Sequence, residues 1–114
     1  MKLPHADQAI VERAKICDYL LNPTHRFGAS KARFFAEFGF SLDVWEELAV
    51  AFKEHARENE VVKCKQTGFG PRFEIEGELR APDGRRPRVL SVWQIDVGEV
   101  APRLITAHPL EAES

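Results

Sequence analysis

The sequence predicts an α+β domain in which about three N-terminal helices pack on a four-stranded antiparallel meander. Up to about residue 60 apolar residues recur at helical spacing, and from about residue 61 they alternate with polar residues as in strands. Turn-forming residues separate the alternating segments, which favours hairpins. We therefore expect one domain over 1–114, with a helical half (1–60), a sheet half (61–110) and a frayed tail (111–114).

The first helix is predicted from one apolar face that comprises Ile10, Ala14, Cys17 and Leu21. It is expected to begin near Asp7, because an aspartate side chain can accept hydrogen bonds from the first free backbone N–H groups. It should end before Asn22-Pro23, since proline disfavours helical geometry in the residue before it.

Two further helices follow a loop over residues 22–29. Ser30 is expected to cap a short helix over 31–38, which Gly39 ends. Ser41 is expected to cap a longer helix, in which one apolar stripe faces the core and comprises Trp45, Leu48, Ala49, Phe52 and Ala56.

Four strands account for the second half, over residues 61–66, 72–79, 89–97 and 103–108. The turn Ala81-Pro82-Asp83-Gly84 joins the second strand to the third. Because side chains alternate along a strand, the last one is expected to place Leu104, Thr106 and His108 on the same face.

Length and composition indicate an ordinary globular protein. The chain has 114 residues, of which 44% are hydrophobic and 30% charged, values that argue against disorder and leave no room for a dinucleotide-binding sheet. No apolar run approaches the ~20 residues that span a membrane. The N-terminus has no secretory signal, so we expect a cytoplasmic protein without a membrane partner.

Cysteine and histidine spacing gives no support for a metal centre. Cys17 and Cys64 are far apart and are expected to be free, buried thiols rather than a disulfide or zinc ligands. His5 is expected at the N-terminal surface and His55 on a helix face, and neither is assigned a role. The sequence also has no nucleophile elbow and no phosphate-binding loop, so no metal and no cofactor are predicted.

The distribution of charge points to a local anion site although the net charge is −2. No acidic residue lies between Asp18 and Glu37, a window that holds His25, Arg26, Lys31 and Arg33. The window between Asp83 and Asp96 is also free of acids and holds Arg85, Arg86, Arg88 and Trp93. Together the windows could form one anion-binding face. Alternatively, these cations are solvated or pair with glutamates.

Metal-free cleavage of RNA by its own 2′-hydroxyl needs a base, an acid and a cation, which this chain can supply. His25, Lys31, Thr106 and His108 are the candidate catalytic residues. The candidates for substrate binding are Arg26, Arg33, Arg88 and Trp93, and Trp93 or Phe27 could stack a base. The alternatives to a catalytic role are that His25 only caps its loop and that His108 lies at a frayed strand end.

Three segments resemble an uncharacterised bacterial family of small proteins and C-terminal modules of adhesin-like polymorphic toxins. They are 18–25 (DYLLNPTH) with Gly28-x-x-Lys31-Ala32-Arg33, 88–93 (RVLSVW) and 102–110 (PRLITAHPL). The family commonly has Tyr where this chain has His108. Its arrangement is similar to that of the barnase, EndoU, colicin and RelE superfamily of metal-independent ribonucleases.

The resemblance implies a ribonuclease-like toxin of a toxin–antitoxin or polymorphic-toxin system, with an antitoxin or immunity protein as partner. It favours His25, Lys31, Arg33, Trp93 and Thr106 as the site. A module that binds nucleic acid or a partner protein without catalysis remains the alternative, and an inactive scaffold is a third.

Overall fold

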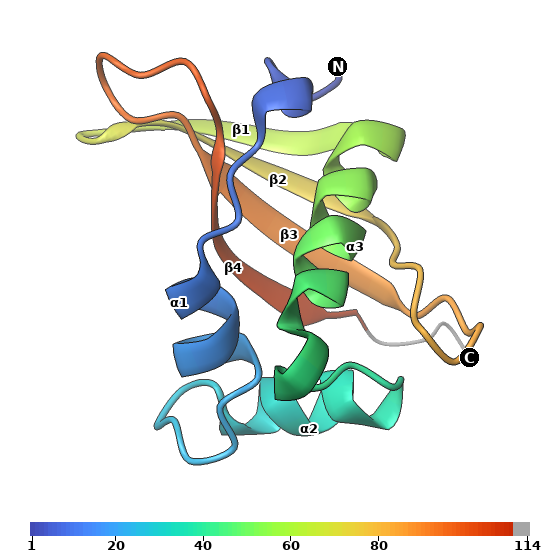
Figure 1. Ribbon diagram of the computed structural model, residues 1–114. Helices are drawn as coiled ribbons and strands as arrows, with labels where there is room; N and C mark the ends of the chain where they lie inside the picture. The colour runs from blue at the N-terminus through green and yellow to red at the C-terminus, as the bar shows by residue number, and fades with distance from the viewer. Residues whose placement is uncertain (111–114) are drawn as a thin grey trace.

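Helix α3 (Trp45–Glu58) crosses one face of a twisted four-stranded sheet, as Figure 1 shows. The structure is a computed structural model that describes residues 1–110, so the predicted frayed tail at 111–114 lies outside the described residues. Neighbouring strands are antiparallel and consecutive, in the order β1 (Val61–Thr67), β2 (Gly70–Glu78), β3 (Arg88–Gln94) and β4 (Arg103–Pro109).

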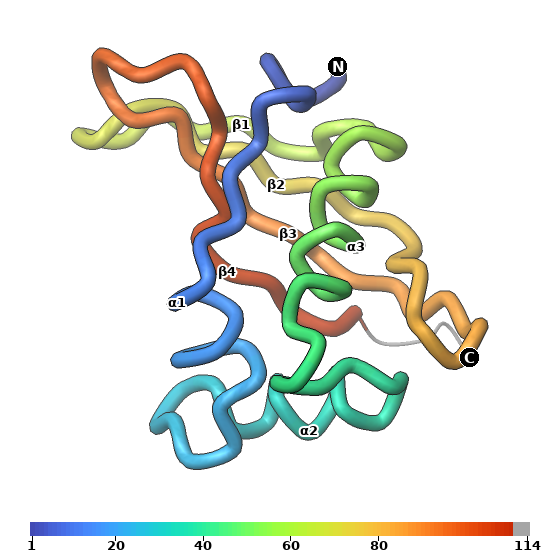
Figure 2. Tube along the Cα trace, viewed as in Figure 1, coloured from blue at the N-terminus to red at the C-terminus, as the bar shows by residue number. Residues whose placement is uncertain are grey.

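The helical half precedes the sheet, which confirms the predicted α+β arrangement of helices followed by a meander. Helix α1 (Arg13–Lys15) continues directly into a π-helical segment, η2 (Ile16–Leu20), and α2 (Ala29–Glu37) lies across the end of α3 (Figure 2). Two short 3₁₀ turns complete it, η1 (Ala6–Gln8) and η3 (Leu42–Val44). No helix within residues 1–110 combines the length and the apolar character that a bilayer span requires.

The core lies between α3 and one face of the sheet. Leu48, Phe52 and Ala56 are fully buried on α3, as their spacing of four residues predicts. The sheet contributes its inner face, which comprises Phe73, Ile75, Gly77, Val89, Ser91, Trp93, Leu104 and Ala107.

Among residues 1–110 no helix covers the opposite face of the sheet, which we call the outer face (Figure 1). Strand register aligns its side chains in rows, of which the first two run across all four strands. The first row is Lys65, Arg72, Gln94 and Arg103; the second is Lys63, Glu74, Val92 and Thr106; the third and fourth hold Glu76, Leu90, His108, Glu78 and Arg88.

The start of the first helix differs from the sequence prediction. Ile10 is not helical, because it forms a parallel bridge with Arg103 in which its N–H donates to Pro102 O and its carbonyl accepts from Leu104 N. The helix begins at Arg13 instead, and it buries Ile16 and Leu20 rather than the predicted face with Ala14 and Cys17. Pairing with the edge of the sheet therefore replaces the expected first turns.

Two smaller predictions were also wrong. Ser30 lies inside α2, and neither it nor Ser41 makes a side-chain cap; Gly28 precedes α2, and η3 separates Ser41 from α3. Both cysteines are free as expected, but Cys64 is exposed on the sheet-edge strand β1 and Cys17 is only half-buried.

Candidate functional site

Three side chains from distant parts of the chain meet beside β4. Lys31 Nζ on α2 donates to Tyr19 Oη at 2.6 Å and to Thr106 Oγ1 at 3.0 Å. The Tyr19 and Thr106 hydroxyls lie 2.9 Å apart, which closes a triangle. We call this the Tyr19–Lys31–Thr106 cluster. It joins η2, α2 and the outer face of the sheet in a single contact network.

Counting hydrogens shows what the cluster can offer to a ligand. An ammonium carries three hydrogens and each hydroxyl carries one, so the three groups hold five, of which their three mutual bonds use three. One N–H and one O–H remain. Within residues 1–110 no carboxylate forms an ion pair with Lys31, so the cluster keeps a charge of +1. Two spare donors and a positive charge suit a phosphate oxygen pair.

The surroundings of Tyr19 change its acidity. Burial by itself raises the pKa of the Tyr19 phenol, but hydrogen bonds with Lys31 and Thr106 and the charges of Lys31 and Lys15 outweigh burial and lower that pKa below its ordinary value of 10.0. The Lys15 Nζ also lies 5.5 Å from the centroid of the Tyr19 ring. Tyr19 is therefore a stronger acid than a free tyrosine.

The local backbone explains how Tyr19 reaches this place. It belongs to the π-helical segment η2, a wider helical turn of a kind frequent at functional sites. Gly28 packs directly on the Tyr19 backbone, where a Cβ would collide with the Tyr19 carbonyl oxygen. The glycine thus lets the loop before α2 lie flat against η2, and this contact sets the distance between Tyr19 and Lys31.

Thr106 reaches the cluster through a β-bulge in β4. Trp93 lies opposite Leu104, but Val92 lies opposite Thr106, so Ile105 is an additional residue in the strand. The bulge contradicts the prediction that Leu104 shares a face with Thr106: Leu104 is buried in the core. It turns Thr106 to the outer face, which His108 shares as expected.

His25 closes its own loop. Its Nδ1 atom accepts hydrogen bonds from the backbone N–H groups of Phe27, at 2.9 Å, and Gly28, at 3.0 Å. These bonds need the Nδ1 lone pair, so the neutral ring carries its proton on Nε2. The ring packs on Tyr19, with 4.9 Å between centroids. This geometry is that of the loop-capping alternative, with only Nε2 available to a ligand.

A shallow groove of about 510 Å³ runs past the cluster. His108 lines it with Tyr19, His25, Phe27 and Thr106, and the two remaining lining residues are Lys15 and Ile105. Partial withdrawal from water and the charge of Lys31 lower the pKa of His108, while Glu74 acts in the opposite direction. His108 is therefore biased towards the neutral form, which can accept a proton.

Residues 2–111 match a family described as "Domain of unknown function (DUF6883)". The chain belongs to this family. A chain of the contact-dependent growth inhibition toxin–immunity protein complex from Klebsiella pneumoniae 342 is similar in fold, with a TM-score of 0.73 and 19% identity over 89% of this chain and 99% of that one. No curated protein sequence matches the chain. An uncharacterised family over nearly the whole chain agrees with the sequence resemblance, whereas the ribonuclease superfamily stays a prediction.

The predicted basic residues of this DUF6883 domain do not gather at one place. Arg26 is exposed beside the groove, with its guanidinium 5.2 Å from the Phe27 ring centroid. Arg33 follows Lys31 by two residues, about 200° around α2, and is exposed on another side of it. Arg88 lies in the last row of the outer face and lines a separate polar pocket with Arg86. The two acid-free windows thus do not form one basic face.

Trp93 cannot stack a base where it lies. Its side chain is fully buried, and its indole N–H donates to Ser91 Oγ at 2.8 Å. The same hydroxyl contacts His55 Nδ1 at 2.9 Å, and His55 Nε2 faces the carbonyls of Gly77 and Val89. His55 lies on the buried face of α3, so Trp93 and His55 belong to a polar network of the core.

Sequence reasoning missed Tyr19 and Lys15 as site residues. Tyr19 is the single tyrosine of the chain and belongs to segment 18–25, three residues before the turn residues Asn22-Pro23. Lys15 precedes it by four residues, a spacing that places two side chains on the same helix face. A search for a hydroxyl near Lys31 could have found Tyr19, but no spacing rule relates it to Thr106.

Proposed function

We propose that this chain is a ribonuclease-like toxin domain that cleaves RNA at the Tyr19–Lys31–Thr106 cluster without a metal ion. One observation supports the proposal: the cluster retains a positive charge and two spare donor hydrogens, and the nearby His108 has a lowered pKa that favours its neutral form. A cation with two donors can hold a phosphate, and the histidine can take a proton. Likeness in fold to a chain of a toxin–immunity protein complex supports the toxin part.

The proposed reaction is attack by a ribose 2′-hydroxyl on the adjacent phosphate. His108 takes the 2′-proton as the new 2′-O–P bond forms, and Lys31 stabilises the negative charge on the phosphate oxygens. The bond from phosphorus to the 5′-oxygen breaks, and that oxygen receives the Tyr19 proton, which the lowered pKa of the phenol favours. The products are a 2′,3′-cyclic phosphate and a 5′-hydroxyl. His25 Nε2–H and Arg26 serve as further phosphate donors.

A partner protein follows from the same proposal. A toxin that its own cell makes needs an antitoxin or immunity protein, and covering the groove is the direct way to block it. Lys15 lines the groove, Lys31 belongs to the cluster that it passes, and Arg26 is exposed beside it. Because these three side chains are cationic, we expect an acidic surface on that partner. The product of a neighbouring reading frame is the first candidate to co-express.

The test compares wild type with Tyr19→Phe and Lys31→Met on end-labelled RNA in excess EDTA. Lys53→Met is a matched control, because Lys53 is exposed on α3, away from the outer face. We expect wild type and the control to release fragments with cyclic phosphate ends, and the two cluster variants to lose at least a hundredfold in rate. A 2′-deoxy nucleotide at the cleaved position should block the reaction.

The same preparations separate catalysis from binding alone. The geometry of His25 favours a non-catalytic module, because its Nδ1 atom already accepts hydrogen bonds from two backbone N–H groups. If wild type binds RNA and Lys31→Met does not, yet no fragment forms between pH 5 and pH 9, the module is the correct function. Wild type that is harmless in a bacterial host and leaves RNA intact contradicts the toxin proposal.

A further inference from the structure

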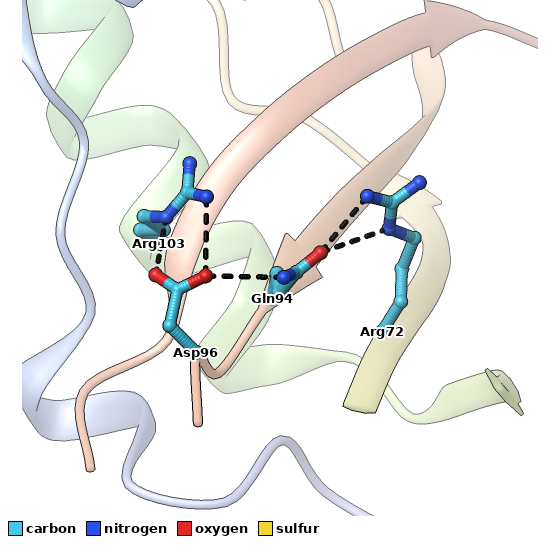
Figure 3. Close-up of polar contacts among 4 residues, drawn as sticks. All are labelled: Arg72, Gln94, Asp96 and Arg103. Carbon is cyan, nitrogen blue, oxygen red and sulfur yellow. Dashed lines mark hydrogen bonds and ion pairs between the residues drawn. The ribbon is translucent and has the colours of Figure 1, made fainter. Parts of the chain in front are cut away.

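A second polar network occupies the outer face at the end of the strands near the β1–β2 hairpin. Figure 3 shows the Gln94 side chain between Arg72 and Asp96. Arg72 donates through Nε and Nη2 to Gln94 Oε1, at 3.3 and 2.8 Å, and Gln94 Nε2 donates to Asp96 Oδ1 at 3.0 Å. Arg103 binds both Asp96 oxygens, at 2.6 and 3.2 Å. Gln94 is almost fully buried, so this arrangement fixes the direction of Arg72.

Arg72 is held in place but its charge is not neutralised. Asp96 is already paired with Arg103, and within residues 1–110 no carboxylate lies within ion-pair distance of Arg72. Lys65 stands directly opposite Arg72 in the strand register and has no ion pair there either. The next pair along, Lys63 and Glu74, compensates itself. The first row of the outer face therefore presents two uncompensated cations.

The turn of the hairpin that carries Lys65 and Arg72 also holds an exposed aromatic ring. Phe69, in the turn three residues before Arg72, is 73% exposed. Its backbone is nonetheless well held: its N–H donates to Thr67 Oγ1, and its carbonyl accepts from Val97 N at 2.9 Å. The second bond ties the hairpin to the β3–β4 loop, and the two segments lie side by side in Figures 1 and 2. An exposed ring on a held backbone, in the same hairpin as two cations, offers a nucleotide a surface for its base and positive charge for its phosphate.

The register relates this place to the first site. Thr106 is opposite Val92 and Arg72 is opposite Gln94, so Arg72 lies two residues along and two strands across from Thr106. At about 3.4 Å per residue and about 4.8 Å per strand, the separation is about 12 Å, a span of a few nucleotides. Glu76 and Glu78 occupy β2 in the other direction, where they repel a polyanion.

We propose that Arg72, Lys65 and Phe69 form a second nucleotide subsite, for an unpaired stretch of RNA whose reacting phosphate lies at the Tyr19–Lys31–Thr106 cluster. The identity of the ligand rests on the proposed function. Phe69 stacks on a base, which requires that the base is free of a partner strand, and Arg72 and Lys65 hold the phosphate next to it. Glu76 and Glu78 on β2 repel the RNA, which is thereby confined to the path between the two subsites.

The experiment measures binding with probes that cannot be cleaved, 2′-O-methyl oligonucleotides of two to eight residues and a hairpin duplex. The variants are Arg72→Gln, which keeps an amide donor for Gln94, and Phe69→Ser. The control is Arg57→Gln, because Arg57 is exposed on α3 and away from the outer face. We expect wild type and control to bind the eight-residue probe more tightly than the two-residue probe, and the duplex weakly.

Phe69→Ser is expected to weaken binding of the eight-residue probe about tenfold without changing binding of the two-residue probe. Arg72→Gln should lower the slope of log Kd against log salt by about 0.7, the value of one single-strand phosphate contact. The second subsite is overturned if affinity increases from the two-residue to the eight-residue probe by the same factor in wild type and in both variants. It is also overturned if wild type binds the duplex as tightly as the eight-residue probe. Because the probes cannot react, these outcomes do not depend on cleavage: Arg72-dependent binding without any cleavage of RNA overturns only the proposed function.

Discussion

The hydroxyl groups of Tyr19 and Thr106 lie 2.9 Å apart although 87 positions separate them in the chain. One comes from a helical segment and the other from an edge strand, and Lys31 binds both. The contact depends on the packing of the helical half against β4. Any test of the site is therefore also a test of how these two halves of the domain are joined.

Removing either hydroxyl should separate activity from stability. In Tyr19→Phe and Thr106→Val the ring or the branched shape stays, so the free energy of unfolding should change by no more than about 1 kcal/mol. RNA cleavage should fall roughly 10²- to 10⁴-fold if the hydroxyl transfers or orients the proton. Thr24→Val, in the exposed loop, is the control. Unchanged cleavage in both cluster variants would exclude a role for the hydroxyls.

Loss of the ammonium group should have a larger effect on anions than on the fold. Lys31→Met keeps most of the aliphatic stem but removes the charge and all three donors of Nζ. We expect the affinity for short RNA to fall about tenfold or more and to become less dependent on salt. Isothermal titration at two salt concentrations measures both. A Lys31→Met protein with the salt dependence of wild type would mean that the phosphate binds elsewhere.

Gly28→Ala should disturb the cluster through the backbone of Tyr19, on which Gly28 packs. The new methyl group would meet the Tyr19 carbonyl oxygen, so the loop or η2 must move, at a cost of about 1–3 kcal/mol. Both a lower melting temperature and weaker cleavage are expected. Gly68→Ala is the matched control, because an added Cβ there meets no atom within 4 Å. Equal melting temperatures for the two variants would contradict the close packing of Gly28 on Tyr19.

The buried His55 should make folding sensitive to mild acid. Burial lowers its pKa below the ordinary 6.5, although the carbonyls of Gly77 and Val89 act in the other direction. The unfolded chain then binds the proton more readily, so stability is complete above about pH 6.5 and falls as the pH drops towards the lower pKa of the folded state. Urea unfolding at several pH values measures this. His55→Gln should be less stable throughout but should lose less on acidification; an equal loss would contradict the assignment.

Most of the fold could be predicted because alternation in a strand directly reflects which face is buried. Phe73 and Ile75 are buried and their neighbours Glu74 and Glu76 lie on the outer face, as the pattern indicates. The first helix could not be placed, since Ile10 fits a helical stripe equally well but pairs with the edge of the sheet. Such long-range pairing leaves no local signal.

The site was only partly predictable for a related reason. Lys31 was found because a lysine in a first helical turn opposes the helix dipole, and Thr106 because its hydroxyl shares a strand face with the His108 imidazole. Trp93 was wrongly assigned to the binding surface, because an aromatic residue near arginines gives the same sequence pattern whether it is exposed or buried. In the structure its indole N–H donates to Ser91, two residues away, in the core. The convergence with Tyr19 is a property of the tertiary structure alone.

The additional residue Ile105 in β4 and the wide turn of η2 have a consequence for sequence comparison and for engineering. Each adds one residue to an otherwise regular element and so changes which side chains face the core. Thr106 follows the additional residue in β4, and Tyr19 belongs to the wide turn. A relative that lacks either would keep every core position and lose the triangle. The length of these two segments, counted against the buried residues around them, should thus divide DUF6883 domains into those able to hold a phosphate here and those retained for another purpose.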